Sequence, residues 1–181
     1  MMRYGLLLLA AICTSAVADD CRPVDTAGGA VTFRVMQAGA PFTGAFRRYS
    51  GQVCFKQGRM TRIDVWLDPS SVDTGLPELD IALKDKEFFA VREFQRISFV
   101  STSVQAQGDS RLARGTLEIK GRRREMDIGF RIQQGSGRSV VDGAFVLDRL
   151  QFGIGTGEWA NTAWLGANVQ VEFKAALADK K

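Results

Sequence analysis

The chain has 181 residues, a formal net charge of +4 and no histidine. The missing histidine removes the commonest general base and the commonest metal ligand, so neither an enzyme nor a metal site is expected. The mild positive charge lacks the clustered basic faces of nucleic-acid-binding proteins, and no nucleic-acid partner is expected either.

The first 18 residues have the features of a secretory signal peptide. Arg3 precedes the apolar stretch GLLLLAAIC, which is too short to span a bilayer, and AVA ending at Ala18 offers a small-x-small cleavage pattern. Cleavage there would leave residues 19–181, a length that suits one domain with a sizeable core. The sequence therefore predicts a soluble periplasmic protein of a single domain, and a monomer and a dimer both fit it.

Two of the three cysteines remain after such cleavage. A lipid anchor would need a small residue before a cysteine, whereas Ile12 precedes Cys13 and Asp20 precedes Cys21. In an oxidising compartment we expect Cys21 and Cys54 to form a disulfide, with two unpaired thiols as the alternative. A metal site is not expected from two distant cysteines without histidine.

Alternation of apolar and polar residues dominates the rest of the chain and predicts β-strands with one buried face. In TRIDVWLD, for example, Ile63, Val65 and Leu67 alternate with polar neighbours and Trp66. Eight strands are predicted, at residues 31–36, 43–55 (bent by glycines), 61–68, 96–104, 111–120, 126–132, 139–148 and 168–177.

One segment, GLPELDIALKDKEFF, breaks this alternation and predicts a short helix between the third and fourth strands. Pro77 suits a first helical turn, acidic residues come early and lysines late, and Leu76, Leu79 and Leu83 fall on one helical face. This helix is expected to cover an end or side of the sheet.

Eight strands without helical crossovers are best closed into an up-and-down antiparallel barrel, because closure removes exposed sheet edges. Such a barrel has an interior that side chains fill or that holds one ligand. A two-sheet sandwich is the alternative.

The stretch FGIGTGEWANTAW resembles a phosphate-binding loop only superficially. It lacks the Lys-Ser or Lys-Thr end of a Walker loop and the following helix of a dinucleotide site. Gly153, Gly155 and Gly157 are interpreted instead as a bend at a barrel corner, in strand conformation. Trp159 and Trp164 are expected to close or line one end of the barrel.

Other polar residues carry weaker signals. GRRRE, from Gly121 to Glu125, is interpreted as a solvated hairpin turn, with attraction of anionic lipid head groups as the alternative. For Arg47 and Arg48, attraction of anionic lipid head groups is likewise the alternative. Such attraction would produce a transient contact with a membrane surface. Carboxylates on the strands are interpreted as solvated rather than catalytic.

Several ordered blocks of the sequence resemble the YceI-like family. These are SSVDTG followed by Asp80, Leu83, the pair Phe88 and Phe89, Val91 and Phe94; then ISFVST at residues 97–102; then GTLEIKG; and finally Arg149, Phe152, Gly153 and Gly155. The resemblance runs from about Val31 to Ala176.

This resemblance implies a lipocalin-like, eight-stranded barrel that binds the tail of an isoprenoid or fatty lipid, such as a quinone or a polyprenyl lipid, for transport or storage, without catalysis or cofactor. Twelve phenylalanines against two tyrosines fit either such a lipophilic interior or a dense core. A solid barrel acting as an interaction module for a membrane redox or stress-response partner is the alternative, and an enzyme acting on a lipid is the least favoured.

Alternation and the matched blocks together predict which side chains face the lumen. The predicted ligand-binding residues are Phe33, Val35, Phe42, Phe46, Val53, Phe55, Ile63, Val65, Leu67, Leu83, Phe88, Phe89, Phe99, Leu117, Ile128, Phe130, Phe145, Leu147, Phe152, Trp159, Trp164, Val171 and Phe173.

Overall fold

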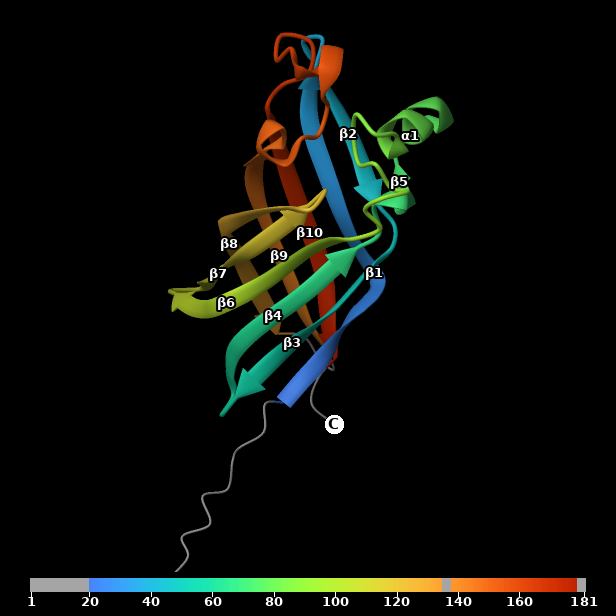
Figure 1. Ribbon diagram of the computed structural model, residues 1–181. Coiled ribbons are helices and arrows are strands. Elements are labelled where there is room, and N and C mark those ends of the chain that lie inside the picture. The colour runs from blue at the N-terminus through green and yellow to red at the C-terminus, as the bar shows by residue number, and fades with distance from the viewer. Residues whose placement is uncertain (1–19, 135–137, 179–181) are drawn as a thin grey trace, which may run out of the picture.

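A computed structural model describes residues 20–134 and 138–178 (Figure 1). The predicted signal peptide, residues 1–18, lies outside them. The elements in chain order are β1 (Asp20–Gln37), β2 (Ala40–Phe46), β3 (Tyr49–Lys56), β4 (Arg59–Leu67), η1 (Pro69–Ser71), β5 (Val72–Asp73), α1 (Pro77–Lys84), β6 (Ile97–Gln107), β7 (Ser110–Ile119), β8 (Arg122–Gln134), β9 (Arg138–Asp148), η2 (Arg149–Phe152), η3 (Gly157–Ala160) and β10 (Asn168–Ala178).

The strands form a closed antiparallel barrel, as predicted. Its ring runs through β1, β3, β4, β6, β7, β8, β9 and β10, and pairing of β10 with β1 closes it. This closure excludes the sandwich. β2 pairs with the second half of β1, and the two-residue β5 pairs with β2. The largest differences from the predicted strands are that β1 begins at Asp20 rather than at residue 31, and that the bent strand at 43–55 is divided into β2 and β3.

The predicted helix is present as α1 but is shorter than the predicted segment. Glu78 and Asp80 lie in its first turn and Lys84 in its last, as a helix dipole favours. Asp80 also accepts two hydrogen bonds from Thr74, at 2.8 Å each, which tie α1 to the preceding turn. Leu76, predicted to share one helical face with Leu79 and Leu83, is the N-cap residue and is exposed.

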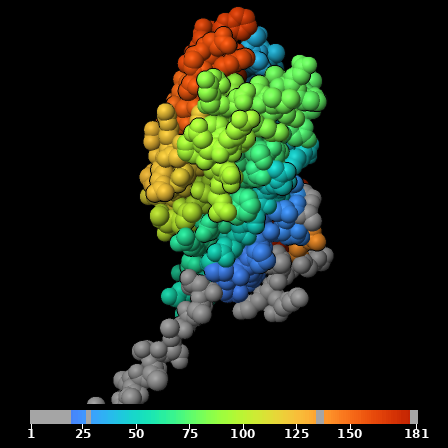
Figure 2. Space-filling view, turned by 45° about the vertical axis from the view of Figure 1, so that its right-hand side comes forward, coloured from blue at the N-terminus to red at the C-terminus, as the bar shows by residue number. Residues whose placement is uncertain are grey.

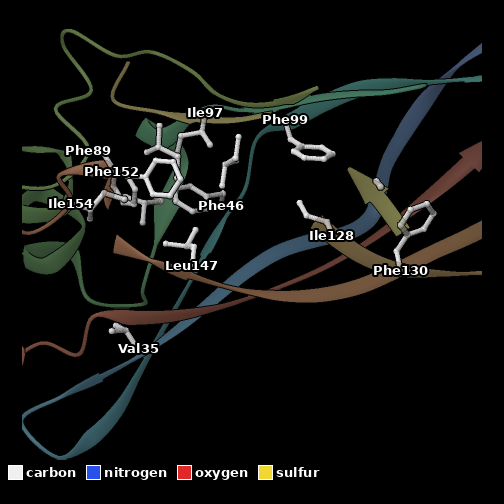
Figure 3. Close-up of a cluster of buried hydrophobic side chains, with 14 of the residues drawn as sticks. Val35, Phe46, Phe89, Ile97, Phe99, Ile128, Phe130, Leu147, Phe152 and Ile154 are labelled. Atoms are coloured by element: carbon white, nitrogen blue, oxygen red, sulfur yellow. The ribbon is translucent and has the colours of Figure 1, made fainter. Parts of the chain in front are cut away.

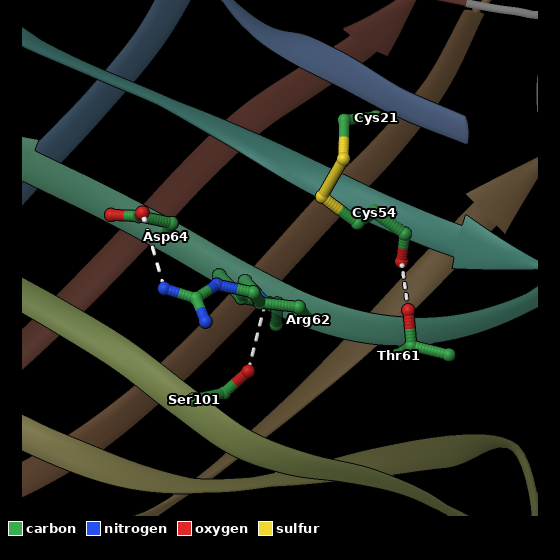
Figure 4. The surroundings of a disulfide bond; sticks show 7 residues. Cys21, Cys54, Thr61, Arg62, Asp64 and Ser101 are labelled. Carbon is green, nitrogen blue, oxygen red and sulfur yellow. Dashed lines mark hydrogen bonds and ion pairs between the residues drawn. A yellow bond between two sulfur atoms is a disulfide. The ribbon is translucent and has the colours of Figure 1, made fainter. Parts of the chain in front are cut away.

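The disulfide between Cys21 and Cys54 is present, as predicted (Figure 4). The two cysteines face each other across β1 and β3, in a short pairing that runs from Asp20 to Pro23. This bond therefore joins the first described residues to the wall of the barrel.

A buried arginine holds the long connection between β9 and β10. Arg149 is 1% exposed, and its guanidinium donates to carbonyls around the whole loop. The acceptors are the oxygens of Ile154 (2.7 Å), Gly155 (2.9 Å), Trp159 (2.7 Å), Leu165 (2.6 Å) and Gly166 (2.9 Å). Burial lowers the pKa of Arg149, while Asp148 favours its charged form. An arginine nevertheless stays charged, so these carbonyls solvate a buried cation.

The alternating glycines belong to this loop and not to a strand, so their predicted strand conformation is wrong. Gly153, Gly155 and Gly157 have φ values of 66°, 70° and 66°, in the left-handed region. Glycine adopts this region without the steric cost of a Cβ atom. The chain turns at each of these glycines after β9. These turns bring the carbonyls of the loop around Arg149.

Two glycines offer a matched test of the Arg149 network. A Cβ atom on Gly155 would lie 2.4 Å from Nη1 of Arg149, whereas one on Gly157 would meet nothing within 4 Å. Gly157→Ala should lower the free energy of unfolding by about 1 to 2 kcal/mol through backbone strain alone. Gly155→Ala should cost about 1 to 3 kcal/mol more, because it displaces a buried donor. Urea unfolding of both variants checks this, and equal losses would contradict it.

The disulfide should contribute measurably to stability. Its cysteines are 33 positions apart, and closing such a loop is worth about 3 to 4 kcal/mol in the chain-entropy account. Cys21→Ser with Cys54→Ser should lower the free energy of unfolding by this amount in urea titrations. Reductant should destabilise the parent protein equally and leave the double variant unchanged; a parent indifferent to reductant would contradict the prediction.

Candidate functional site

The barrel encloses a cavity of about 290 Å³. Its lining comes from every strand of the ring, from α1 and from the β9–β10 loop. Figure 3 shows Phe46, Phe89 and Ile97 gathered near one end of the barrel, with Phe99 and Phe130 farther along its axis. The volume is close to the lower limit of small-molecule pockets.

The structure brings together nearly all of the predicted lumen residues. Those that line the cavity are Phe33, Val35, Phe42, Phe46, Val53, Ile63, Val65, Leu67, Leu83, Phe88, Phe89, Phe99, Leu117, Ile128, Phe130, Phe145, Leu147, Trp159, Val171 and Phe173. For those on strands, the placement follows from strict alternation; Leu83 lies on α1, Phe88 and Phe89 in the turns after it, and Trp159 on η3. Their contact with a ligand stays a prediction.

Three predicted residues do not line the cavity, and each departs from alternation for a local reason. Phe55 follows a register shift between β3 and β4, and its ring lies under the Arg22 guanidinium, 4.6 Å away. Phe152 is buried in the turn η2, outside any strand. Trp164 is 63% exposed, and Leu165 points into the cavity in its place.

Sequence reasoning missed other wall residues, mainly at the ends of strands and in loops. Val24 lies in the part of β1 that precedes the predicted strand, and it pairs with Leu177 near the end of β10; both line the cavity. Ile154 and Leu165 come from the loop held by Arg149. Ile97 was also missed, although it lies two positions before the predicted Phe99 in the same alternating run of β6.

Aromatic rings pack against one another at the end of the cavity near α1. Phe46 has centroid distances of 5.6 Å to Phe33 and 5.4 Å to Phe89. On the other side, Phe88 packs on Trp159 at 5.5 Å. In the space-filling view, α1 (green) and the β9–β10 loop (orange) lie at this end of the molecule (Figure 2). These rings and segments close much of that end.

Few polar groups face the cavity. Trp66 and Trp159 line the cavity. The other lining side chains with polar heads are Gln37, Tyr49, Ser98, Arg149 and Lys174. Arg149 is already bound to the loop carbonyls. Burial, and next the charge of Asp25, raise the pKa of Tyr49, so this phenol is neutral at physiological pH. The wall can bind hydrocarbon but holds few groups that could orient a polar ligand deep inside.

The basic runs noted in the sequence are engaged in the protein itself. Arg47 pairs with Asp73 at 2.8 Å and Arg48 with Asp68 at 2.7 Å. Arg123 pairs with Glu118 at 2.7 Å in the hairpin of β7 and β8. Ionic contacts of this kind compete with any attraction to lipid head groups.

The described residues also lack the arrangements of a metal centre and of a membrane-spanning helix. Within residues 20–134 and 138–178, no group of three or more acidic, cysteine or histidine side chains is placed to hold a metal ion. In the same residues no helix is long and apolar enough to cross a membrane. Buried polar side chains in these ranges are Ser71, Ser101 and Arg149, and the hydrogen bonds of each are structural.

Known proteins resemble the chain in sequence and in fold. Protein YceI of Salmonella arizonae is 33% identical over 112 residues, which cover 59% of this chain and 58% of that protein; the match thus spans under two thirds of the relative. The crystal structure of Burkholderia cenocepacia BcnA superposes with a TM-score of 0.80 at 28% identity, covering 84% of this chain and 98% of BcnA.

A second solved structure shares the fold at lower identity. It is described as a polyisoprenoid-binding domain from Saccharophagus degradans implicated in plant cell wall breakdown, and has a TM-score of 0.72 at 16% identity, with 87% of this chain and 98% of that chain covered. The YceI-like domain family matches residues 23–177, almost the whole described chain. The protein belongs to the YceI-like family.

Proposed function

We propose that the protein is a periplasmic lipid-binding protein that holds the tail of an isoprenoid or fatty lipid, such as a quinone or a polyprenyl lipid, in the barrel lumen for transport or storage. The observation that carries this proposal is the cavity of about 290 Å³ with a wall of hydrocarbon and aromatic rings. The polyisoprenoid-binding description of the Saccharophagus degradans domain supports it by analogy of fold.

The energetics favour a tail over a polar ligand. Each CH₂ group moved from water into such a cavity contributes about 0.8 kcal/mol, whereas a buried polar group without a partner costs about 1 to 3 kcal/mol. Phe33, Phe99 and Phe145 offer broad apolar contact and no hydrogen-bonding group. The proposed role is therefore binding rather than catalysis.

The composition of the native cargo tests this function. The mature protein, purified from its native periplasm without detergent and extracted with organic solvent, should yield one prenyl or fatty lipid near one per chain by mass spectrometry. A barrel that is empty and also refuses added isoprenoids and fatty acids would contradict the proposal. That result would favour the interaction module.

Partly filling the lumen should weaken binding without unfolding the barrel. Ala113 on β7 is 1% exposed and lines the cavity, so Ala113→Phe places a ring where the tail is proposed to lie. Excluding about three CH₂ groups at about 0.8 kcal/mol each should weaken binding more than tenfold. Competition against a fluorescent fatty-acid probe measures this loss. Ala106→Phe, at an exposed alanine of β6, is the control and should bind normally.

We also propose that the end of the barrel bearing α1 contacts the membrane transiently. Backbone hydrogen bonds from Ala38 to Trp164 and from Gly166 to Met36 hold the exposed Met36 and Trp164 near each other. α1 lies at the same end (Figure 1), and it carries the exposed Ile81 and begins after the exposed Leu76. Exposed aromatic and apolar side chains at one end suit insertion between lipid head groups.

Vesicle binding tests this contact. Replacing Met36 and Trp164 with serine should reduce co-sedimentation with lipid vesicles roughly tenfold, because both side chains would otherwise leave water. Val146→Ser, at an exposed valine on the side of the barrel, is the control and should sediment like the parent. Equal binding of all three proteins would contradict a contact at this end.

A further inference from the structure

Tyr49 brings a polar group to the inner face of the barrel. It is the first residue of β3 and pairs with Leu67 of β4. Residues paired across two antiparallel strands point to the same face of the sheet. Because Leu67 lines the cavity, the Tyr49 side chain points inward as well, and it is itself part of the cavity wall. A phenol therefore stands among the apolar side chains of the lumen.

The Tyr49 hydroxyl lies against an irregular part of β1. The pairing of β1 with β10 shifts between Asp25 and Ala30. A Cβ atom on Gly29, within this stretch, would overlap the Tyr49 hydroxyl and would lie 2.5 Å from the Lys174 carbonyl oxygen. Glycine at position 29 thus leaves the space that the hydroxyl occupies. The place of the hydroxyl is fixed by the backbone of β1 and β10 around it.

This hydroxyl is weakly engaged within the protein. It donates to the Thr26 carbonyl oxygen at 3.5 Å. A good hydrogen bond between two oxygens is about 2.7 to 2.8 Å long. A phenol can donate one hydrogen bond and also accept another. The long bond to Thr26 can therefore be exchanged for a shorter one to a ligand oxygen.

Other polar residues at the cavity are less suited to hold the head of a lipid. The Arg149 guanidinium is already bound to loop carbonyls. Ser98 and Lys174 border the cavity, but each alternates with inward phenylalanines on its strand, so its polar head turns away from the lumen. Gln37 is the last residue of β1 and lies at the rim, beside Leu165 of the β9–β10 loop. Tyr49 is the best-placed anchor among them.

The surroundings of Tyr49 favour a neutral head over an anion. Burial, and next the charge of Asp25, raise the pKa of Tyr49, so its hydroxyl keeps its proton and can donate. Asp25 itself pairs with Arg138 at 3.6 Å. An ionised phosphate would have to leave water for an apolar wall near this carboxylate, which is costly. A hydroxyl or carbonyl oxygen loses less hydration and can bond to the phenol.

We propose that Tyr49 anchors the head of the bound lipid, with its hydroxyl hydrogen-bonded to a neutral oxygen, either a hydroxyl or a carbonyl, while the tail lies along the apolar lumen. The inference rests on the proposed function and narrows its ligands to lipids with an uncharged head. Prenyl alcohols and quinones fit this description, whereas prenyl phosphates do not.

Tyr49→Phe tests the anchor, because it removes the hydroxyl and keeps the ring. The bond to Thr26 is long, so the variant should unfold in urea like the parent. Gln37→Leu removes the polar head at the rim and serves as the comparison. The probes share one decyl chain and differ in their heads: decane, decanol, decyl methyl ketone and decyl phosphate. Displacement of a fluorescent apolar probe gives each affinity.

The parent protein should bind decanol and the ketone roughly tenfold or more tightly than decyl phosphate, because the phosphate must be desolvated. Tyr49→Phe should weaken decanol and the ketone about threefold to tenfold, the net worth of one hydrogen bond, and change decane less than about twofold. Gln37→Leu should bind all four probes like the parent.

Equal affinities of the parent and Tyr49→Phe for decanol and the ketone would overturn the anchor, as would a loss confined to Gln37→Leu. A parent that binds decyl phosphate as tightly as decanol would overturn the neutral head. A parent that binds none of the four probes, decane included, would instead refute the proposed function, and this inference with it.

Discussion

The antiparallel pairing of β10 with β1 is the constraint on which the rest of the structure depends. It joins the first and last strands from Val24 with Leu177 to Arg34 with Gln170. Without this pairing both strands would be open edges, prone to pairing with other chains. With it, every inward residue of the ring faces one enclosed space, so the cavity is a direct product of closure.

The two ends of the barrel are held by different interactions. At the α1 end the chain carries a buried cation, Arg149, surrounded by carbonyls of a loop that left-handed glycines turn around it. This polar network fixes the loop, whose residues Trp159 and Leu165 form part of the cavity wall. At the other end the disulfide fastens β1 to β3. Ends held in this way and an apolar lumen fit the proposed role as a container for lipid tails.

The parts of the fold and site that follow from local pattern could be predicted from the sequence. Alternation placed Ile63, Val65 and Leu67 on the lumen face correctly because β4 is regular there. It failed at Phe55, beside a register shift, and at Trp164, in an irregular loop. The carbonyl cage of Arg149 was also beyond it, because that cage consists of side-chain hydrogen bonds within an irregular loop, where no alternation applies.

Selective quenching of one tryptophan by a brominated lipid chain would test the central claim, that a tail lies in the lumen, most directly. Trp159 lines the cavity and Trp164 is exposed, so each can serve as the sole indole once the other and Trp66 are replaced with phenylalanine. A brominated fatty acid should quench Trp159 saturably, near one per chain, and leave Trp164 much less affected. Absence of saturable quenching of Trp159, with the protein folded, would contradict the account.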